Sequence, residues 1–318
     1  MMQLTLAICV FNAERYIAET LRSVLSQSFK DFHLLIVDDC SSDSSVEIIQ
    51  EFFKSNPRQY ELICFDKNQG ICHARRFAER YAKTPFMMFL DADDILLPEA
   101  IEKMWRKIQS DSDIIAVGCY LDYIDCKGKK LGGGLYLGET TKEGFIAKAN
   151  AGKLIFMQPT AIYNRDASLK VGGYVTEGFP AGTPRYQDFC EDLDLWTRMS
   201  DLYVDGKAII VLPETLALYR KGGGLSSNSL YMILKMRYTK HNVKARRNGL
   251  SEKIFTEFLA EIPEREMRML RKEAYVADSL RNGAILLKRG NIVKGGFLIL
   301  KSIIANPAYV LDKIKHNL

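Results

Sequence analysis

Short apolar runs alternate with amphipathic stretches along the first 120 residues of the chain. The runs are rich in β-branched and aromatic residues, which is typical of buried strands, and the stretches between them carry apolar residues at helical spacing. Asn12 is predicted to cap the first helix, with Glu14 in its first turn. The predicted strands lie at 4–10, 32–37, 60–65, 86–90 and 114–120. Because strands and helices alternate, we expect an α/β fold with a mostly parallel central sheet flanked by helices.

The pattern is less regular in the middle of the chain. Residues 154–163 and 203–212 are predicted as further strands. A loop rich in glycine and proline, 172–184, leads into an acidic segment that opens a helix at Glu191 and Asp192. From Leu230 to the end of the chain the spacing of apolar residues is mostly helical, with breaks at Pro263 and Gly283.

Charge is distributed unevenly over the sequence. The whole chain carries 44 Lys+Arg and 39 Asp+Glu, a net charge of +5. Residues 231–318 hold 18 of these basic and 8 of the acidic side chains, a net of +10, so the rest of the chain is at −5. Solvated helix faces would explain a basic tail, and so would a surface that docks onto an anionic partner.

Several classes of protein lose support from motifs that the sequence lacks. The seven cysteines form no C-x-x-C pair, which favours buried, reduced thiols over disulfides. The four histidines do not have the spacing of zinc ligands. Neither G-x-G-x-x-G nor a Walker sequence is present, which speaks against dinucleotide oxidoreductases and P-loop proteins. No signal peptide and no membrane-spanning segment is predicted.

Acidic side chains directly follow two of the predicted strands. Asp38-Asp39 come after the second strand, and Asp91-Ala92-Asp93-Asp94 come after the fourth. Ligands bind at the carboxyl ends of strands in parallel sheets, so we expect both clusters at one edge. Adjacent carboxylates repel one another unless a cation compensates, and Mn²⁺ or Mg²⁺ prefers oxygen ligands. The alternatives are a strand-ending turn for the first cluster and a helix-capping turn for the second.

Two other polar segments suggest chemistry. Glu191-Asp192 supplies a carboxylate that could act as a general base, although acidic residues also favour helix N-termini without any catalytic role. Arg220 and Lys221 precede three glycines, so they could neutralise phosphate charge from a mobile loop. Solvated surface cations are the alternative for this pair.

The ordered series of segments is similar to the inverting family 2 glycosyltransferases. The segments that carry this resemblance are Ala7–Glu14, Ser23–Phe32, Val37–Asp43, Asn68–Gly70, Ala74-Arg75, Phe89–Asp94, and Glu191-Asp192 with Arg198. Together they extend over residues 3–220. The chain departs from the common family pattern at Cys9-Val10-Phe11, where many members have Pro-Thr-Tyr, at Cys40 in place of glycine, and at Arg76 in place of asparagine.

The resemblance implies a GT-A type fold, the nucleotide-diphospho-sugar transferase fold, with a helical C-terminal extension. Residues 1–225 would form the catalytic domain, with a nucleotide-sugar-binding half at about 1–120 and an acceptor-binding half at about 121–225. Residues 226–318 would form a basic helical region.

The resemblance also implies roles for single residues. Asp39 would contact the nucleobase, commonly uracil, and Asp91 and Asp93 would address ribose and metal. Because D-x-D-D permits two registers, either Asp93 or Asp94 would hold the metal, Mn²⁺ or Mg²⁺. Asp192, beside Glu191, would be the general base. The predicted nucleotide-sugar site consists of Val10, Asn12, Glu14, Asp38, Asp39, Asn68, Gly70, Arg75, Asp91, Ala92, Asp93 and Arg220.

The predicted activity is metal-dependent, inverting transfer of a hexosyl group from a nucleotide-diphosphate donor, with UDP as the expected nucleotide. The acceptor would be a hydroxyl of a glycan or lipid-linked saccharide in lipopolysaccharide, capsule or other surface polysaccharide biosynthesis. A sugar-phosphate nucleotidyltransferase and a non-catalytic nucleotide-sugar-binding scaffold are the alternatives.

The basic tail suggests where this reaction takes place. Apolar residues from 285 to 304 are interleaved with Lys288, Arg289, Lys294 and Lys301, which fits an interfacial helix on anionic lipid. A helical subdomain that packs on the catalytic domain is the alternative. We expect a cytoplasmic protein, peripheral on the inner face of the plasma membrane, with no nucleic-acid partner.

Overall fold

The computed structural model describes residues 2–222, 228–288 and 290–311. Two compact units make up the chain. The α/β unit comprises Met1–Glu177 and Glu191–Gly222, and the helical unit comprises Gly178–Cys190 and Gly223–Leu318. The segment 178–190 belongs to the helical unit, although it leads along the chain directly into Glu191.

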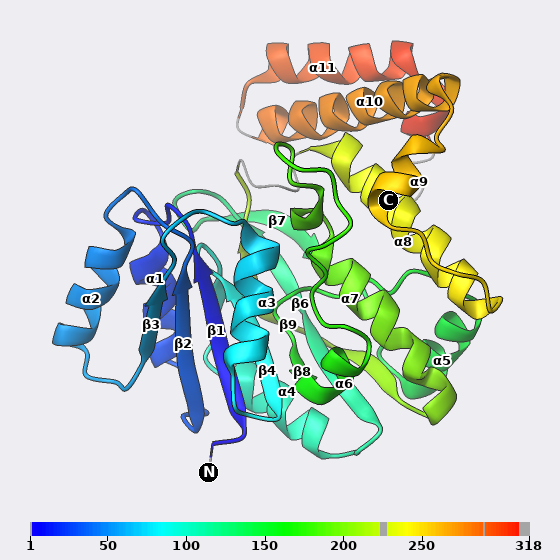
Figure 1. The fold of residues 1–318 in the computed structure, drawn as a ribbon. Helices are drawn as coiled ribbons and strands as arrows, with labels where there is room; N and C mark the ends of the chain where they lie inside the picture. Colours follow the sequence, from blue (N-terminus) through cyan, green and yellow to red (C-terminus); the bar gives the residue numbers. More distant parts are fainter. Residues whose placement is uncertain (1, 223–227, 289, 312–318) are drawn as a thin grey trace. The chain divides into compact units, whose positions relative to one another are not determined.

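The first half of the α/β unit has the predicted parallel sheet. Its strands are β1 (Leu4–Val10), β2 (Phe32–Asp38), β3 (Glu61–Cys64) and β4 (Phe86–Asp91). They lie in the order β3-β2-β1-β4, and all three neighbouring pairs are parallel (Figure 1). The nearly continuous burial of β1, β2 and β4 explains why these strands are apolar without alternation.

The second half makes the sheet mixed. Past β4 the order continues β8-β6-β9-β5, and β7 pairs with β6. Only β6 and β9 are parallel in this half, whereas β8, β5 and β7 pair antiparallel to their neighbours. The strand bounds are β5 Ile95–Leu96, β6 Ile114–Ile124, β7 Lys130–Leu135, β8 Ile162–Asn164 and β9 Ala208–Arg220.

Two strand predictions and one cap prediction are wrong in detail. Most of 154–163 is irregular, because the chain turns at Pro159 and the Ile155 N–H bonds to a threonine side chain instead of a strand. Residues 200–205 form a 3-10 helix that ends at a left-handed Gly206, so the strand begins only at Ala208. The first helix begins at Ile17, so Asn12 lies too far upstream to cap it.

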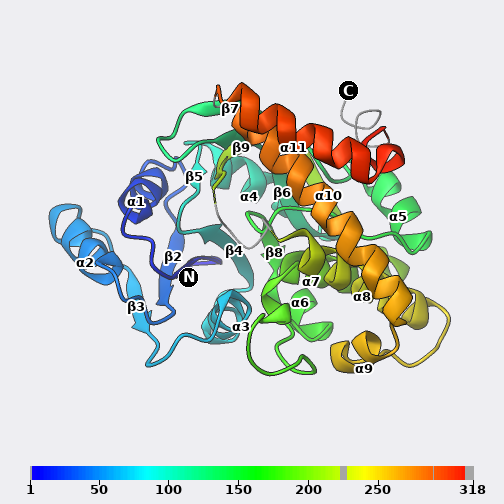
Figure 2. The same ribbon diagram turned by 90° about the horizontal axis from the view of Figure 1, so that it is seen from above.

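Helices cover both faces of the sheet. Helix α3 contacts β1 and β2 on one face, and α4 contacts β6, β8 and β9 on the other, where α1 also lies (Figure 2). The helix bounds of this unit are α1 Ile17–Leu25, α2 Ser45–Ser55, α3 Ile71–Tyr81, α4 Ala100–Gln109, α5 Lys142–Asn150, α6 Arg165–Lys170 and α7 Glu191–Met199.

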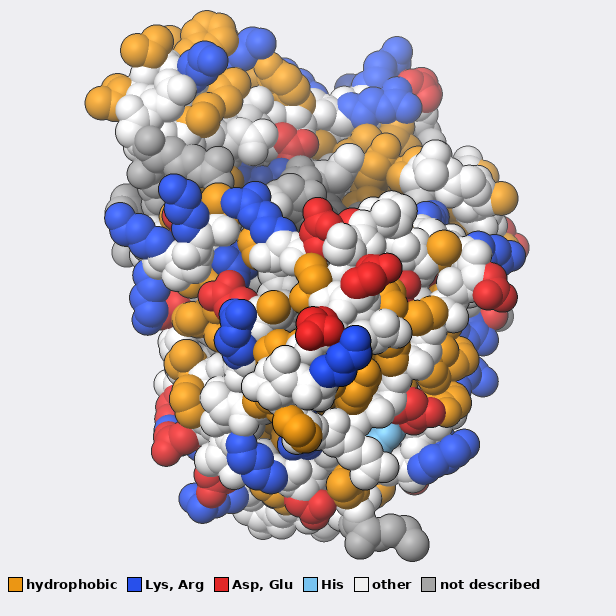
Figure 3. All heavy atoms as spheres, turned by 90° about the vertical axis from the view of Figure 1, so that its left-hand side faces the viewer, with side chains coloured by type: hydrophobic (Ala, Val, Ile, Leu, Met, Phe, Trp, Pro, Cys, Tyr) orange, Lys and Arg blue, Asp and Glu red, His pale blue; other side chains and the backbone are white. Residues whose placement is uncertain are grey.

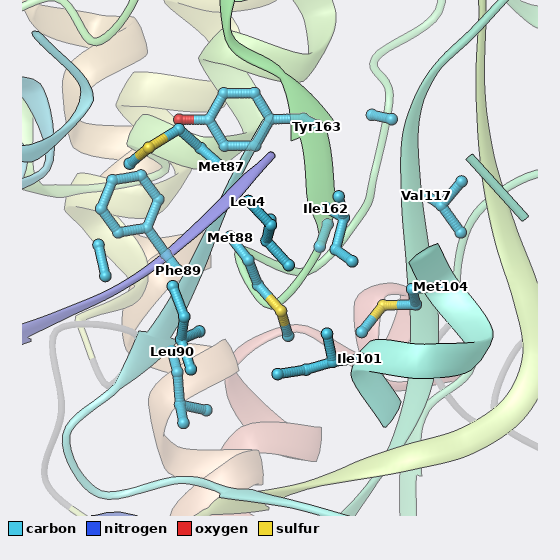
Figure 4. Close-up of a cluster of buried hydrophobic side chains, with 14 of the residues drawn as sticks. Leu4, Met87, Met88, Phe89, Leu90, Ile101, Met104, Val117, Ile162 and Tyr163 are labelled. Atoms are coloured by element: carbon cyan, nitrogen blue, oxygen red, sulfur yellow. The ribbon is translucent and has the colours of Figure 1, made fainter. Parts of the chain in front are cut away.

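The core lies between the sheet and these helices. Met88 of β4 meets Ile101 and Met104 of α4, with Val117 of β6 beside them, and all four side chains are fully buried (Figure 4). Truncating such a residue to alanine costs about 2–5 kcal/mol. This packing fixes the end of β4 relative to the rest of the sheet.

The helical unit has its own, smaller core. Leu234, Phe255 and Leu270 are buried among partly buried aromatic residues. The Phe179 ring packs against the Phe255 ring in a tilted arrangement, with the ring centres 5.2 Å apart, so the segment 178–190 is part of this core. The helices are α8 Ser229–Arg247, α9 Phe255–Ala260, α10 Glu264–Lys288 and α11 Ile292–Ala305. None of the helices in the described ranges combines the length and apolar character that a bilayer crossing requires.

Candidate functional site

Asp39, directly after β2, is surrounded by hydrogen-bond donors. Its Oδ2 accepts from the Asn68 side chain (2.8 Å) and from the Gly70 N–H (2.7 Å), and its Oδ1 accepts from the Gln69 N–H (2.7 Å). The Asp39 N–H in turn donates to the carbonyl of Val10. Gly70 has a φ of 96°, a conformation that favours glycine, and α3 starts immediately after it. Asp39 therefore fixes the loop between β3 and α3.

The loops after β1 and β2 are joined by carboxylates and amides. Asn12 and Glu14 each accept a backbone N–H of a serine in the loop after β2, at 2.9 and 3.0 Å. Asp38 accepts the N–H of Ser41 through Oδ2, while its Oδ1 is buried with no hydrogen-bond partner in the described part of the chain. The loops that carry these predicted residues thus form one connected surface at the carboxyl ends of β1 and β2.

The turn Asp91–Asp94 is held from two sides. The Thr20 hydroxyl of α1 lies 3.0 Å from the Ala92 carbonyl and 2.8 Å from the Asp94 carbonyl, so it ties the turn to α1. The Asp94 carboxylate accepts the backbone N–H of Arg220, at the end of β9, at 2.9 Å. The carboxylates are therefore presented on a fixed backbone.

Arg220 is buried under this turn. Its guanidinium donates to the carbonyl of Asp93 (2.8 Å), to the carbonyl of Asp125 (2.9 Å) and to the carboxylate of Glu19 (2.6 Å). The ring of Tyr16 lies 4.5 Å from its central carbon. All three nitrogens of the guanidinium thus bond within the protein, and its contact with a donor phosphate stays a prediction.

The positive charge near Asp93 and Asp94 does not compensate for the burial and mutual repulsion of these carboxylates. Burial, reinforced by the nearby Asp91 carboxylate, raises the pKa of Asp93 to about 6. The same causes, with repulsion from Asp93, raise the pKa of Asp94 well above its usual value. Arg220 opposes both shifts but does not cancel them. A bound divalent cation would relieve this repulsion.

Asp93 and Asp94 provide two carboxylates for such an ion but do not enclose it. No group of three or more His, Cys, Asp or Glu side chains arranged to hold a metal occurs in the ranges that the structure describes. Asp94 is buried, whereas Asp93 is half-buried and reaches solvent. Mg²⁺-like ions are commonly held by one or two carboxylates together with substrate phosphates, and this turn fits that mode of binding.

Arg75 of α3 connects the turn to the start of α7. Its Nη2 donates to the Asp91 carboxylate at 2.5 Å, and its Nη1 donates to the Glu191 carboxylate. The guanidinium is only 3% exposed and lies 5.6 Å from the centre of the Phe89 ring. Acidic residues that are 100 positions apart in the sequence are thereby brought to one cation.

Glu191 and Asp192 occupy the first turn of α7. Both side chains are partly exposed, and Asp192 accepts the N–H of Leu193 at 2.8 Å. Burial raises the pKa of both carboxyl groups, more than the neighbouring Arg75 lowers it. Tyr174 is fully buried near this pair, and its hydroxyl has no hydrogen-bond partner among the described residues.

Hydrogen bonds link most of the predicted residues into two groups, whereas Asn12, Glu14 and Asp38 bond to serines of the loop after β2. The first group is centred on Asp39 and contains Val10, Asn68 and Gly70. The second is centred on Arg75 and on the turn after β4, and contains Asp91, Ala92, Asp93, Asp94, Glu191 and Arg220, with Asp192 next along the chain.

Other residues shape the site without having been predicted. Tyr16, Glu19 and Thr20 hold Arg220 and the acidic turn, and Tyr174 packs edge-on against Phe89. In the sequence the first three occupy ordinary positions in and just before a helix. Their only distinguishing feature is a cluster of polar groups on one side of an otherwise apolar helix.

The chain has a fold of the GT-A type, the nucleotide-diphospho-sugar transferase fold. The family model described as glycosyl transferase family 2 matches residues 5–172, more than half of the chain. The chain belongs to this family, which confirms the resemblance noted from its motifs.

Curated relatives resemble parts of the chain. It is 39% identical over 116 residues to a teichoic acid poly(glycerol phosphate) polymerase of Staphylococcus epidermidis, a match that covers 36% of this chain and 16% of that protein. The chain spans less than two thirds of the length of the first curated relatives that it matches.

Two solved structures share the fold. S. aureus TarS 1-349 in complex with UDP-GlcNAc has a TM-score of 0.57 and 19% identity, and the match covers 99% of this chain and 92% of that one. The mannosyltransferase PcManGT from Pyrobaculum calidifontis, in complex with GDP-Man and Mn²⁺, has a TM-score of 0.55 and 17% identity, over 99% and 79% of the chains.

Proposed function

We propose that this protein transfers a hexosyl group from a UDP-sugar to a hydroxyl of a glycan or lipid-linked saccharide, with inversion at the anomeric carbon. The observation that carries the proposal is the double ion pair of Arg75. It joins the end of β4, which bears Asp91, to the start of α7, which bears Glu191 and Asp192. A donor-binding turn and a carboxylate base held at one place are what a single displacement requires.

The donor side uses the ends of β2 and β4. TarS, which shares the fold, is described in complex with UDP-GlcNAc, and this supports a uridine nucleotide. Asp39, with its loop at Asn68–Gly70, would receive the nucleobase, and Asp91 would receive the ribose. The unpartnered Oδ1 of Asp38 is a further acceptor at this end of the site.

Asp93 and Asp94 would hold Mn²⁺ or Mg²⁺ together with the donor diphosphate. The ion would neutralise negative charge that develops on the diphosphate as it leaves. We assign the direct contact to Asp93, because its side chain reaches solvent, whereas the Asp94 carboxylate is buried and bonded to the Arg220 N–H. The complex of PcManGT with GDP-Man and Mn²⁺ supports a metal of this type.

Asp192 would remove the proton from the acceptor hydroxyl as its oxygen attacks the sugar. Burial raises the pKa of Asp192, which makes it a better proton acceptor than an exposed aspartate. Glu191 would orient α7 through Arg75 and not touch the acceptor. Arg220 would act on the diphosphate side, directly or through its hold on the carbonyl of Asp93.

The setting we propose is assembly of a bacterial surface polysaccharide, such as teichoic acid, lipopolysaccharide or capsule, at the inner face of the plasma membrane. Similarity over 116 residues to a teichoic acid polymerase supports a surface glycan.

The test is a mass-spectrometric screen of nucleotide sugars with and without Mn²⁺. We expect slow, metal-dependent release of UDP from one donor, and none after Asp192→Asn, which should still bind UDP. Release of pyrophosphate from a nucleoside triphosphate would identify a nucleotidyltransferase instead. Donor binding without turnover of any donor, in the presence of lipid extracts, would identify a non-catalytic scaffold.

A further inference from the structure

Helix α11 packs on α10 through its small residues. A Cβ on Gly295 would lie 2.9 Å from the Gly283 carbonyl, and one on Gly283 would lie 3.0 Å from the Gly295 carbonyl, so the two backbones approach closely here. Ser302, about two turns further along the same face, is fully buried. This inner face is therefore occupied by α10.

The opposite face of α11 is apolar as well. Val293, Phe297, Leu300 and Ile304 recur at intervals of three and four residues and are 83%, 62%, 55% and 73% exposed. Ile292, at the start of the helix, is 73% exposed. Hydrophobic side chains gather accordingly at the upper end of the view in Figure 3, where α11 lies. A contiguous apolar stripe of this kind marks an interaction surface.

The charges on α11 are all of one sign. Lys294 and Lys301 are exposed, and the sequence of the helix, Ile292–Ala305, contains no Asp or Glu. The Lys301 ammonium lies 5.6 Å from the Tyr275 ring and 5.9 Å from the Phe297 ring, so its aliphatic stem runs along apolar surface while its charge stays at the edge. A partner that complements this face therefore has an apolar interior for the hydrophobic side chains and negative charge at its surface for the lysines.

The length of α11 decides how it meets such a partner. Fourteen residues span about 21 Å, short of the roughly 30 Å of a bilayer core. A second copy of the chain fits less well, because pairing two such faces would bring lysines toward lysines. An anionic lipid surface meets both requirements, with α11 lying in its plane.

We infer that the exposed face of α11 (Ile292, Val293, Phe297, Leu300 and Ile304, with Lys294 and Lys301) docks in the plane of an anionic lipid bilayer. The inference deepens the proposed function, on which it rests for its biological sense, because a lipid-linked acceptor is encountered at such a surface. It does not depend on donor or metal.

Vesicle sedimentation of the full chain tests this inference without any donor or acceptor. We expect the protein to bind vesicles that contain phosphatidylglycerol, to bind phosphatidylcholine vesicles much less, and to be released partly by high salt. Phe297→Glu should lower partitioning by about tenfold or more, since it removes a large apolar side chain and adds a charge. Lys294→Glu should lower it by a smaller factor.

The matched control is Leu250→Glu, in the same unit, because Leu250 is 66% exposed but lies outside α11. It should leave partitioning unchanged. Thermal unfolding and UDP binding of each variant separate loss of the surface from loss of the fold. Equal partitioning of Phe297→Glu and Leu250→Glu would overturn the inference, and so would a dimer in light scattering that Phe297→Glu dissociates while vesicles stay unbound. Either result would leave transfer by the α/β unit untouched.

Discussion

Two acidic groups follow strands β2 and β4, which lie on either side of β1 in the sheet, and the groups differ in what surrounds them. After β2, the Asp39 carboxylate accepts three hydrogen bonds from amide groups at 2.7–2.8 Å. After β4, the buried Asp94 and the half-buried Asp93 lie beside a third carboxylate, and desolvation together with this repulsion raises their pKa values. The first carboxylate has three donors that stabilise its charge, whereas in the second group the single N–H that Asp94 accepts from Arg220 does not offset burial and repulsion.

This difference separates carboxylates that stabilise the fold from carboxylates that bind a ligand. A carboxylate that accepts hydrogen bonds from backbone N–H groups holds a loop in place, and removing it should mainly lower the free energy of unfolding. Carboxylates that repel one another destabilise the empty site, and their loss should be felt mainly as lost ligand binding or activity. The variants below test this distinction, starting with the largest expected effect.

Removing Arg75 should have the largest effect on stability. Arg75→Met leaves Asp91 and Glu191 without their shared cation, and breaking a buried ion pair in this way costs about 3–5 kcal/mol. Urea unfolding measures the loss. Arg80→Met, an exposed position on the same helix, is the control and should change little. A similar loss in both variants would mean that the ion pairs contribute nothing specific.

Asp93→Asn should lower activity without lowering stability. The metal would stabilise the transition state by several kcal/mol, and losing one of its ligands removes part of this stabilisation. We therefore expect kcat/KM to fall by about a hundredfold or more. The melting temperature without metal should stay the same or rise, because one repelling charge is gone. Asp66→Asn, at an exposed position of the α/β unit, provides the comparison. A clear drop in melting temperature would place Asp93 with Asp39 among the structural carboxylates.

Asp39→Asn should show the opposite behaviour. An amide in place of the carboxylate turns one acceptor into a donor that faces N–H groups, at a cost of about 1–3 kcal/mol in the free energy of unfolding. Asp31→Asn, exposed just before β2, should cost almost nothing. UDP binding should weaken as well, because the loop that Asp39 holds would receive the nucleobase. An Asp39→Asn variant that unfolds like the parent protein would show that Asp39 does not stabilise the loop.

The sequence predicted both acidic groups equally well but could not distinguish them. Each is a run of aspartates after a buried strand, and strand ends follow from local apolar runs. The difference depends on Asn68 and Gly70 in one case, and on Glu19, Thr20 and Arg220 in the other. These partners come from elements far away in the chain, and no local pattern specifies that contact.

The same reasoning explains which parts of the fold could be predicted. The strands β1, β2 and β4 are buried on both faces, so their apolar runs stand out. Strand β8 has only three residues and is defined by antiparallel pairing to β4 and β6, an arrangement that local composition does not contain.

The pH dependence of the reaction gives the smallest and most specific test. The Asp192 carboxylate accepts the Leu193 N–H, and burial raises its pKa above the usual value of about 3.9. A general base works only when ionised, so kcat at saturating donor should fall as the pH decreases through this raised pKa. Because the Asp91 charge contributes to the shift, Asp91→Asn should move the acid limb to lower pH. Asp39→Asn should not shift the acid limb of the pH profile. If neither substitution shifts this limb, a group other than Asp192 is responsible for it.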